Sequence, residues 1–219
     1  MTRTYPRFTS IDALQRAHRG CRRCVDAGLL PAAHPVFSGH AGQRILLVGQ
    51  APGPVERDQT RPFAGRAGMQ LMRWLARAGL EDEQAVRDRI YMTAMTTCFP
   101  GRRVAGGGDR RPSAREIALC SAWLDSVLAL LQPRLIISVG TLSQSRFLPG
   151  LRLDDTVGNA YGASLAPVTG VPDDPSVVVP LPHPSGQSRW LNEPARARLL
   201  ERALQRLGEL VPWAERVES

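Results

Sequence analysis

The sequence contains no lysine, so all 28 of its basic side chains are arginine. Covalent chemistry through a side-chain amine is therefore excluded, because only the N-terminal amine could form a Schiff base. Genome composition is one explanation of the choice of arginine over lysine. It does not explain the formal net charge of +8. Since arginine binds phosphate bidentately and stacks on planar rings, this excess favours an acidic partner such as nucleic acid.

Long apolar runs are also missing. None reaches the roughly 20 residues that span a bilayer, and the first ten residues, MTRTYPRFTS, have no apolar stretch of the secretory type. We therefore expect a cytoplasmic protein, without a membrane partner, that is a monomer. The 219 residues suit one domain covering 1–219.

Four short apolar segments predict buried strands, because they are rich in β-branched residues and are bounded by Gly, Pro or charged residues. They are Arg44–Gln50, Ile90–Thr97, Arg134–Gly140 and Ser176–Leu181. Helical patterns alternate with them at 67–78, 113–131 and 193–210, the second opening with a capping box at Ser113 and Glu116. This alternation predicts an α/β fold, a three-layer α/β/α sandwich with a central four-stranded parallel sheet.

Ligands of such sheets bind beyond the carboxyl ends of the strands. The loops after the first, second and fourth predicted strands carry the unusual residues, namely Gln50–Gly53, Cys98–Pro100 and His183–Trp190. The stretch Gly101–Pro112 has four glycines, four arginines and no core-forming pattern, which predicts a flexible basic loop. Its arginines are candidate phosphate contacts, although a solvated loop is the alternative: Arg102, Arg103, Arg110 and Arg111.

Cysteine is scarce, with four residues at 21, 24, 98 and 120. Cys21 and Cys24 form a C-x-x-C, a spacing that lets two thiolates hold one metal centre and argues against buried free cysteines. The spacing leaves zinc and an iron–sulfur cluster equally open, because both accept four thiolates. A thioredoxin-type redox pair is disfavoured because no strand precedes Cys21.

Several motifs together resemble the uracil-DNA glycosylase superfamily, and in particular its family 4 (iron–sulfur) members. They are GQAPG at 49–53 after a strand, RPFAGRAG at 61–68, the arginine-flanked cysteines and HPS at 183–185. The resemblance implies a [4Fe–4S] cluster on all four cysteines: Cys21, Cys24, Cys98 and Cys120. It also implies DNA containing deaminated bases as the partner and base excision repair as the process.

Carried over by position, the resemblance implies a base pocket lined by Gly49, Gln50 and Ala51, with Phe63 stacked on an extruded base. His183 falls on the histidine that contacts the base during cleavage, and Ser185 follows it. Three positions depart from the family pattern: Gln50 replaces a glutamate, Ala94 an asparagine that reads the uracil edge, and Thr97 a lysine.

These residues predict a monofunctional DNA glycosylase that hydrolyses the N-glycosidic bond of uracil or a related deaminated base. His183 would hydrogen bond to the departing base, and Gln50 would position water, because an amide cannot accept its proton. Asp58 is a weaker candidate for that proton, since a solvated loop residue is as plausible. Arg189 or Trp190 would enter the duplex, unless Trp190 only packs against the last helix. The alternatives are a lesion-binding protein with little excision activity and a cluster-dependent redox sensor.

Overall fold

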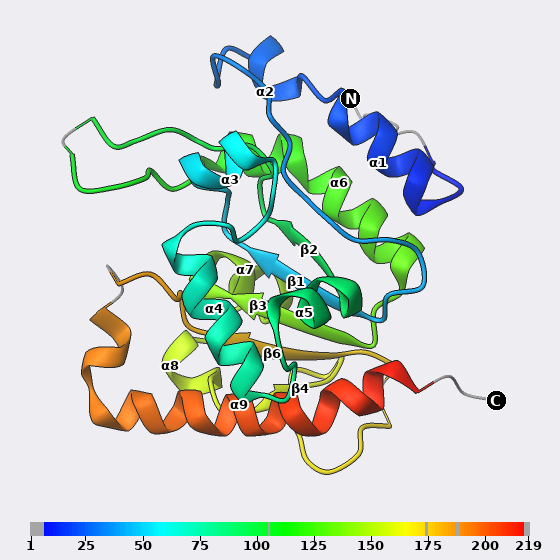
Figure 1. Cartoon of the computed structure of the whole chain (residues 1–219), viewed down its shortest axis with the longest axis vertical. Coiled ribbons are helices and arrows are strands. Elements are labelled where there is room, and N and C mark those ends of the chain that lie inside the picture. The colour runs from blue at the N-terminus through cyan, green and yellow to red at the C-terminus, as the bar shows by residue number, and fades with distance from the viewer. Residues whose placement is uncertain (1–6, 105, 174, 187–188, 217–219) are drawn as a thin grey trace.

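The computed structural model describes residues 7–104, 106–173, 175–186 and 189–216. One sheet runs through the middle of the molecule (Figure 1). Its strands are β1 (Ile45–Gly49), β2 (Ile90–Ala94), β3 (Leu135–Val139), β4 (Ala160–Tyr161), β5 (Pro167–Val168) and β6 (Val177–Leu181). Their spatial order is β2-β1-β3-β6-β4-β5.

The four predicted strands form the parallel part of this sheet. Leu47 of β1 lies opposite Met92 of β2 and Ile137 of β3, and Ile137 lies opposite Val179 of β6. The predicted α/β class is confirmed, but the predicted count of four strands is corrected to six. The additional strands β4 and β5 run antiparallel and have two residues each. Such short strands give no periodic pattern that a sequence could show.

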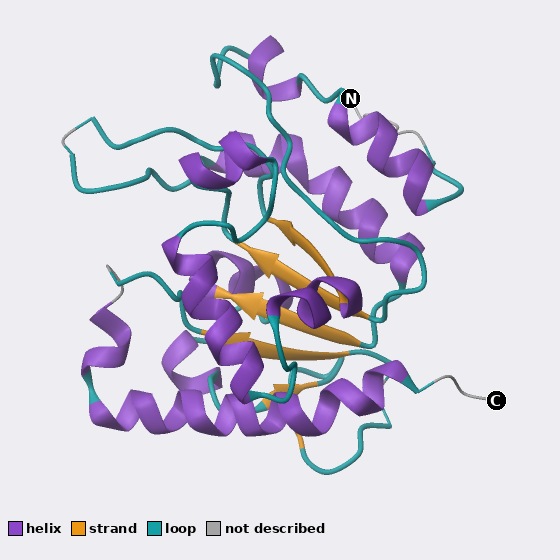
Figure 2. Ribbon diagram, in the orientation of Figure 1, coloured by secondary structure: helices purple, strands orange, loops and turns teal. Residues whose placement is uncertain are grey.

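Helices cover both faces of the sheet (Figure 2). They are α1 (Ile11–Arg19), α2 (Arg23–Asp26), α3 (Pro54–Gln59), α4 (Arg66–Arg77), α5 (Glu83–Arg89), α6 (Ala114–Leu131), α7 (Gly140–Phe147), α8 (Leu153–Thr156), the short 3-10 helix η1 (Arg189–Asn192) and α9 (Pro194–Glu215). The capping box of α6 forms as predicted, with the Ser113 hydroxyl accepting from the Glu116 amide. Within the described residues, no helix has both the length and the apolar character that a bilayer crossing requires.

Alternate residues of each strand point to opposite faces, so the core has two halves. Leu47 and Ile137 pack with α4, α5 and α9, whereas Leu46 and Ile136 pack with α1, α6 and α7. Burial on both faces explains the continuous apolar strands of the sequence. The parallel strands are thereby held rigidly, and their carboxyl ends form one edge from which the loops of interest leave.

The predicted flexible basic loop is a hairpin in part. Arg102 and Asp109 form an antiparallel bridge, and the Arg110 amide donates to the Gly101 carbonyl at 2.9 Å. Gly106, Gly107 and Gly108 all have positive φ, a conformation that glycine adopts without steric cost. The glycines that suggested an irregular loop thus supply a turn, and the hairpin projects from the body of the molecule (Figure 1).

Candidate active site

The end of β1 is shaped by Gly49. A Cβ atom at this position would lie 3.0 Å from Cζ of Phe63, a tight contact that would require the ring to shift slightly. Glycine therefore lets the phenyl ring lie directly on the strand end. The fold brings Gly49 and Phe63 together, although 13 residues separate them in the chain.

Phe63 itself has an unusual backbone. Its φ of +55° lies in the left-handed region, which bulky side chains seldom adopt and which costs on the order of 1–3 kcal/mol. Gly68 tightens the turn further, because a Cβ there would lie 1.8 Å from the Phe63 carbonyl oxygen. The RPFAGRAG segment is therefore folded so that one aromatic ring faces the strand ends.

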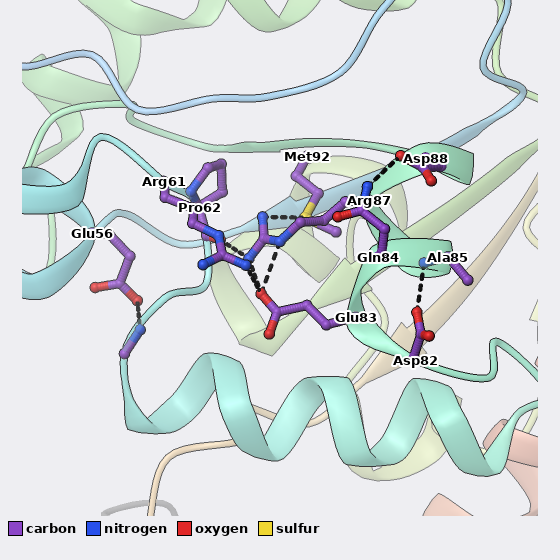
Figure 3. A network of polar contacts seen from close by, with 11 residues as sticks. Glu56, Arg61, Pro62, Asp82, Glu83, Gln84, Ala85, Arg87, Asp88 and Met92 are labelled. Carbon is purple, nitrogen blue, oxygen red and sulfur yellow. Dashed lines mark hydrogen bonds and ion pairs between the residues drawn. The ribbon is translucent and has the colours of Figure 1, made fainter.

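A polar network holds this segment in place (Figure 3). Arg87 donates to the Pro62 carbonyl at 3.0 Å and pairs with Glu83, which also pairs with Arg61. Glu56 accepts from the backbone amides of Gly53 and Gly65, both at 3.1 Å. The GQAPG loop and the Phe63 segment are thus joined through one carboxylate.

His183 follows β6 and lies against the start of α7. A Cβ on Gly140 would lie 3.4 Å from the imidazole Cδ2, in ordinary van der Waals contact, so the ring packs against this residue. Burial lowers the pKa of His183 below its usual value of 6.5. The ring is therefore neutral at physiological pH.

The contacts of Ser185 determine which nitrogen of the His183 ring carries the proton. The Ser185 amide donates to Nδ1 at 3.2 Å, and the Ser185 hydroxyl lies 2.9 Å from the same atom. A backbone amide can only donate, so Nδ1 must be the unprotonated nitrogen. The proton of the neutral ring is then on Nε2, which can donate a hydrogen bond.

The two rings lie over neighbouring strands. Val48 and Ser138 are paired residues near the ends of β1 and β3, and paired strands are about 4.8 Å apart. Gly49 and Gly140, which support Phe63 and His183, each lie just beyond these pairs.

On the other side of β1, Ala94 lies opposite Gly49. Gln50 also faces β2, because its carbonyl accepts from the Thr96 amide at 3.3 Å.

The four cysteines line a single cavity. They come from segments far apart in the chain, at the start of α2, just after β2 and within α6: Cys21, Cys24, Cys98 and Cys120. Among the described residues, no three ligating side chains surround one point as ligands of a single ion would. Four thiols around one cavity suit a metal centre, since a zinc ion and an iron–sulfur cluster both accept four thiolates.

Two of the thiols have hydrogen bonds with side chains. Trp123 donates from Nε1 to Cys21 Sγ at 3.3 Å, and Thr97 Oγ1 lies 3.7 Å from Cys120 Sγ. His18 Nε2 lies 2.9 Å from the same Thr97 hydroxyl. The His18 ring is stacked on Trp123 with centroids 4.3 Å apart, and burial, followed by the charge of Arg23, lowers its pKa to about 3. The neutral His18 ring therefore contacts both Thr97 and Trp123, the side chains that hydrogen bond to Cys120 and Cys21.

Burial raises the pKa of the Cys98 thiol to about 12 and that of Cys120 to about 11. Four thiolates in this cavity would be unstable without positive charge, which metal ions bound to them supply. Glu116 also lines this cavity. Its pKa is lowered to about 2, chiefly by its hydrogen bond from Arg110. The residues present therefore fit a metal cluster.

Several predicted surface residues have other contacts. Trp190 donates its indole N–H to Asp154 and packs against the core, which favours the packing alternative. Arg110 pairs with the buried Glu116 at 2.6 Å, so its guanidinium already has a charged partner within the protein. Asp58 is exposed and paired with Arg57 at 2.7 Å, as expected of a solvated residue.

Arg102 and Arg103 are exposed on the hairpin. Arg189 begins η1, and its side chain lies outside the described residues. The sequence did not reveal Asp109, which lies beside Gly53, or the side chains that hydrogen bond to the cysteine thiols. The bridge between Arg102 and Asp109 places that carboxylate, and a stretch rich in glycine and arginine gave no sign of it.

The chain is an α/β protein whose parallel sheet carries a partly buried histidine and an aromatic ring at its carboxyl edge, with a separate cavity lined by cysteines. A model of the Uracil DNA glycosylase superfamily matches residues 36–208, and the chain belongs to this superfamily. The resemblance predicted from the motifs is confirmed.

Curated relatives agree with this assignment. The chain is 30% identical over 169 residues to the type-4 uracil-DNA glycosylase of Thermotoga maritima, covering 76% of this chain and 77% of the relative. It is 26% identical over 203 residues to the type-4 uracil-DNA glycosylase of Sulfurisphaera tokodaii, covering 92% and 84%. A type-5 uracil-DNA glycosylase of Pyrobaculum aerophilum is 30% identical over 115 residues, 48% of each chain.

Proposed function

We propose that this protein is a DNA glycosylase that hydrolyses the N-glycosidic bond of uracil or a related deaminated base in DNA. The observation that carries the proposal is the placement of Phe63 and His183 over neighbouring strand ends, each ring against its own glycine. The names of the type-4 relatives support the same activity.

The target base must leave the duplex to reach these residues, which costs a few kcal/mol. Phe63 offsets part of this cost, because stacking of a base on an aromatic ring contributes about 1–3 kcal/mol. Its left-handed backbone and the tethered segment around it hold the ring before the base arrives. Gly49 forms the adjoining wall, and its lack of a side chain lets the ring lie close against the strand.

Bond cleavage leaves negative charge on the departing base. His183 donates to this anion from Nε2, because Ser185 occupies Nδ1. The backbone amides of Gln50 and Ala51 are further donors at the end of β1. Each such donor contributes about 3 kcal/mol to the transition state. A neutral imidazole suffices for this role, in agreement with the lowered pKa of His183.

The enzyme is monofunctional in this proposal. A glycosylase that also cleaves the strand uses an amine nucleophile, and the chain has no lysine. The product is therefore an abasic site in an intact strand. Arg102 and Arg103 on the projecting hairpin contact DNA phosphates, which would make binding dependent on salt, and Arg189 at the start of η1 enters the duplex.

Cys21, Cys24, Cys98 and Cys120 would hold a [4Fe–4S] cluster in their shared cavity. Such a cluster supplies a covalent link between distant segments and a redox-active centre. Here the cysteines join the N-terminal segment to the end of β2 and to α6. Broad visible absorption in protein purified without oxygen supports the cluster, whereas stoichiometric zinc without iron contradicts it.

Ala94 favours a second candidate, a lesion-binding protein without excision. It lies beside Gly49 at the end of β2, and its methyl group cannot hydrogen bond to a base edge. An assay on oligonucleotides carrying uracil, hypoxanthine or xanthine separates the two candidates. Abasic sites from any of these substrates support the glycosylase, and binding without abasic sites supports the second candidate.

A further inference from the structure

The proposed reaction needs a group that accepts a proton from water, and the GQAPG loop contains no carboxylate. Three carboxylates near this loop can be compared: Glu56, Asp58 and Asp109. Both oxygens of Glu56 accept backbone hydrogen bonds, from Gly53 and Gly65. Glu56 therefore holds two loops together, and each of its oxygens already accepts a backbone hydrogen bond.

Asp58 is unsuitable for a different reason. Its side chain is 63% exposed and paired with Arg57. The hydrogen bond from Arg57 holds the pKa of the Asp58 carboxyl below its usual value, which weakens it as a base. It therefore resembles an ordinary solvated residue of α3.

Asp109 remains, and the structure places it at the loop. Its Oδ2 lies 3.3 Å from the position that a Cβ on Gly53 would take. The hairpin puts it there, because Asp109 is bridged to Arg102 and the next residue, Arg110, is paired with Glu116 of α6. Although the hairpin projects from the molecule, its second half places the Asp109 carboxylate beside the loop that follows β1.

The surroundings of Asp109 suit a base. Partial desolvation of this exposed carboxylate, and to a lesser extent the negative charge of Glu56, raise its pKa, while Arg102 opposes the rise. No described residue donates a hydrogen bond to its carboxylate, so its lone pairs remain available to water. Asp109 is solvent-exposed, so water reaches it directly, and the raised pKa makes its carboxylate a stronger base than an unperturbed aspartate.

Resting on the glycosylase activity proposed above, we propose that Asp109 is the catalytic residue that activates water for attack on the sugar. The water oxygen bonds to C1′ of the deoxyribose as the C1′–N bond breaks, and Asp109 takes the proton released by the water. The electron pair of the broken bond leaves with the base, whose anion His183 stabilises. The proton then passes from Asp109 to the released base or to solvent.

The test is single-turnover excision from uracil-containing DNA by the full cluster-bearing protein. Asp109→Asn keeps the size and polarity of the side chain but cannot take a proton, so we expect the rate to fall by about 10²–10⁴-fold. Asp109→Glu should retain part of the rate. Asp58→Asn is the matched control on α3, and its rate should equal that of the wild type.

The pH profile distinguishes chemistry from folding. The wild-type rate should decline as pH falls through the pKa of Asp109, and the Asn variant should lack this acid limb while binding DNA equally well. A wild-type rate in Asp109→Asn overturns the assignment and leaves the proposed function intact. If the wild type itself releases no base, the proposed function and this assignment fall together.

Discussion

The backbone amide of Ser185 donates to Nδ1 of His183 at 3.2 Å. This contact fixes the proton of a neutral imidazole on Nε2, because an amide nitrogen cannot act as the acceptor. Burial reinforces the neutral state by lowering the pKa of His183. The donor that the proposed reaction requires is therefore prepared by the HPS motif itself before any DNA binds.

His183→Ala should lower the excision rate by about 10²–10³-fold, the typical effect of removing one donor to a developing anion. DNA affinity should change little, because the contact strengthens as the bond breaks. Single-turnover rates and equilibrium binding to uracil-containing DNA measure the two effects separately. A loss of binding as large as the loss of rate would show that His183 only helps to bind DNA.

Phe63→Ala should weaken binding of the extruded base by about 1–3 kcal/mol, the contribution of one stacked ring. Phe63→Tyr is the matched variant, since it keeps the aromatic face. Fluorescence of a base analogue at the lesion position reports extrusion directly. Equal extrusion by the Ala and Tyr variants would contradict the stacking role.

Ala94→Asn should raise the preference for uracil over hypoxanthine and xanthine. The residue lies opposite Gly49 at the end of β2, so an amide there would reach the neighbourhood of the base edge. Comparison of single-turnover rates on the three substrates measures the preference. Ala94→Leu, which adds bulk without hydrogen bonds, serves as the control, and an identical change in both variants would argue against base reading from this position.

Trp123→Phe should lower the reduction potential of the cluster by about 40 mV, which corresponds to one hydrogen bond of about 1 kcal/mol. The reduced cluster carries more negative charge and is stabilised by the indole N–H at Cys21 Sγ. Phenylalanine keeps an aromatic ring beside His18. Voltammetry or a titration monitored by electron paramagnetic resonance gives the potential. Trp213→Phe, on α9 against Arg134, is the control, and equal potentials in all three proteins would contradict the prediction.

Arg110→Gln should destabilise the fold by about 1–3 kcal/mol at neutral pH, because it leaves the buried Glu116 carboxylate without its charged partner. The folded pKa of Glu116 is about 2, below its reference value of 4.5. The ionised Glu116 therefore contributes to the free energy of unfolding above pH 4.5, and this contribution is lost as pH falls toward about 2.

Urea unfolding at several pH values measures this effect. The free energy of unfolding of Arg110→Gln should depend less steeply on pH over the acidic range than that of the wild type. Arg146→Gln, which removes an exposed pair with Asp125, should change stability by no more than about 0.5 kcal/mol. Equal decreases in the free energy of unfolding of both variants would show that the Arg110–Glu116 pair contributes no more to stability than an exposed ion pair.

The parallel sheet was predictable because its strands are buried on both faces and appear as apolar runs. The contact between Gly49 and Phe63 was implied by motif resemblance, and the structure supplies the reason for the glycine. The position of Asp109 was not predictable, since it depends on a hairpin whose ladder consists of backbone hydrogen bonds. The short strands β4 and β5 and the contact between Trp123 and Cys21 also depend on tertiary packing that leaves no periodic signal.

The measurement that tests the account most directly is the release of base from uracil-containing DNA by the cluster-bearing wild type, with His183→Ala alongside. The account predicts abasic sites in an uncleaved strand for the wild type and a rate about 10²–10³-fold lower for the variant. Tight binding of the same DNA with no abasic sites formed by the wild type would contradict it.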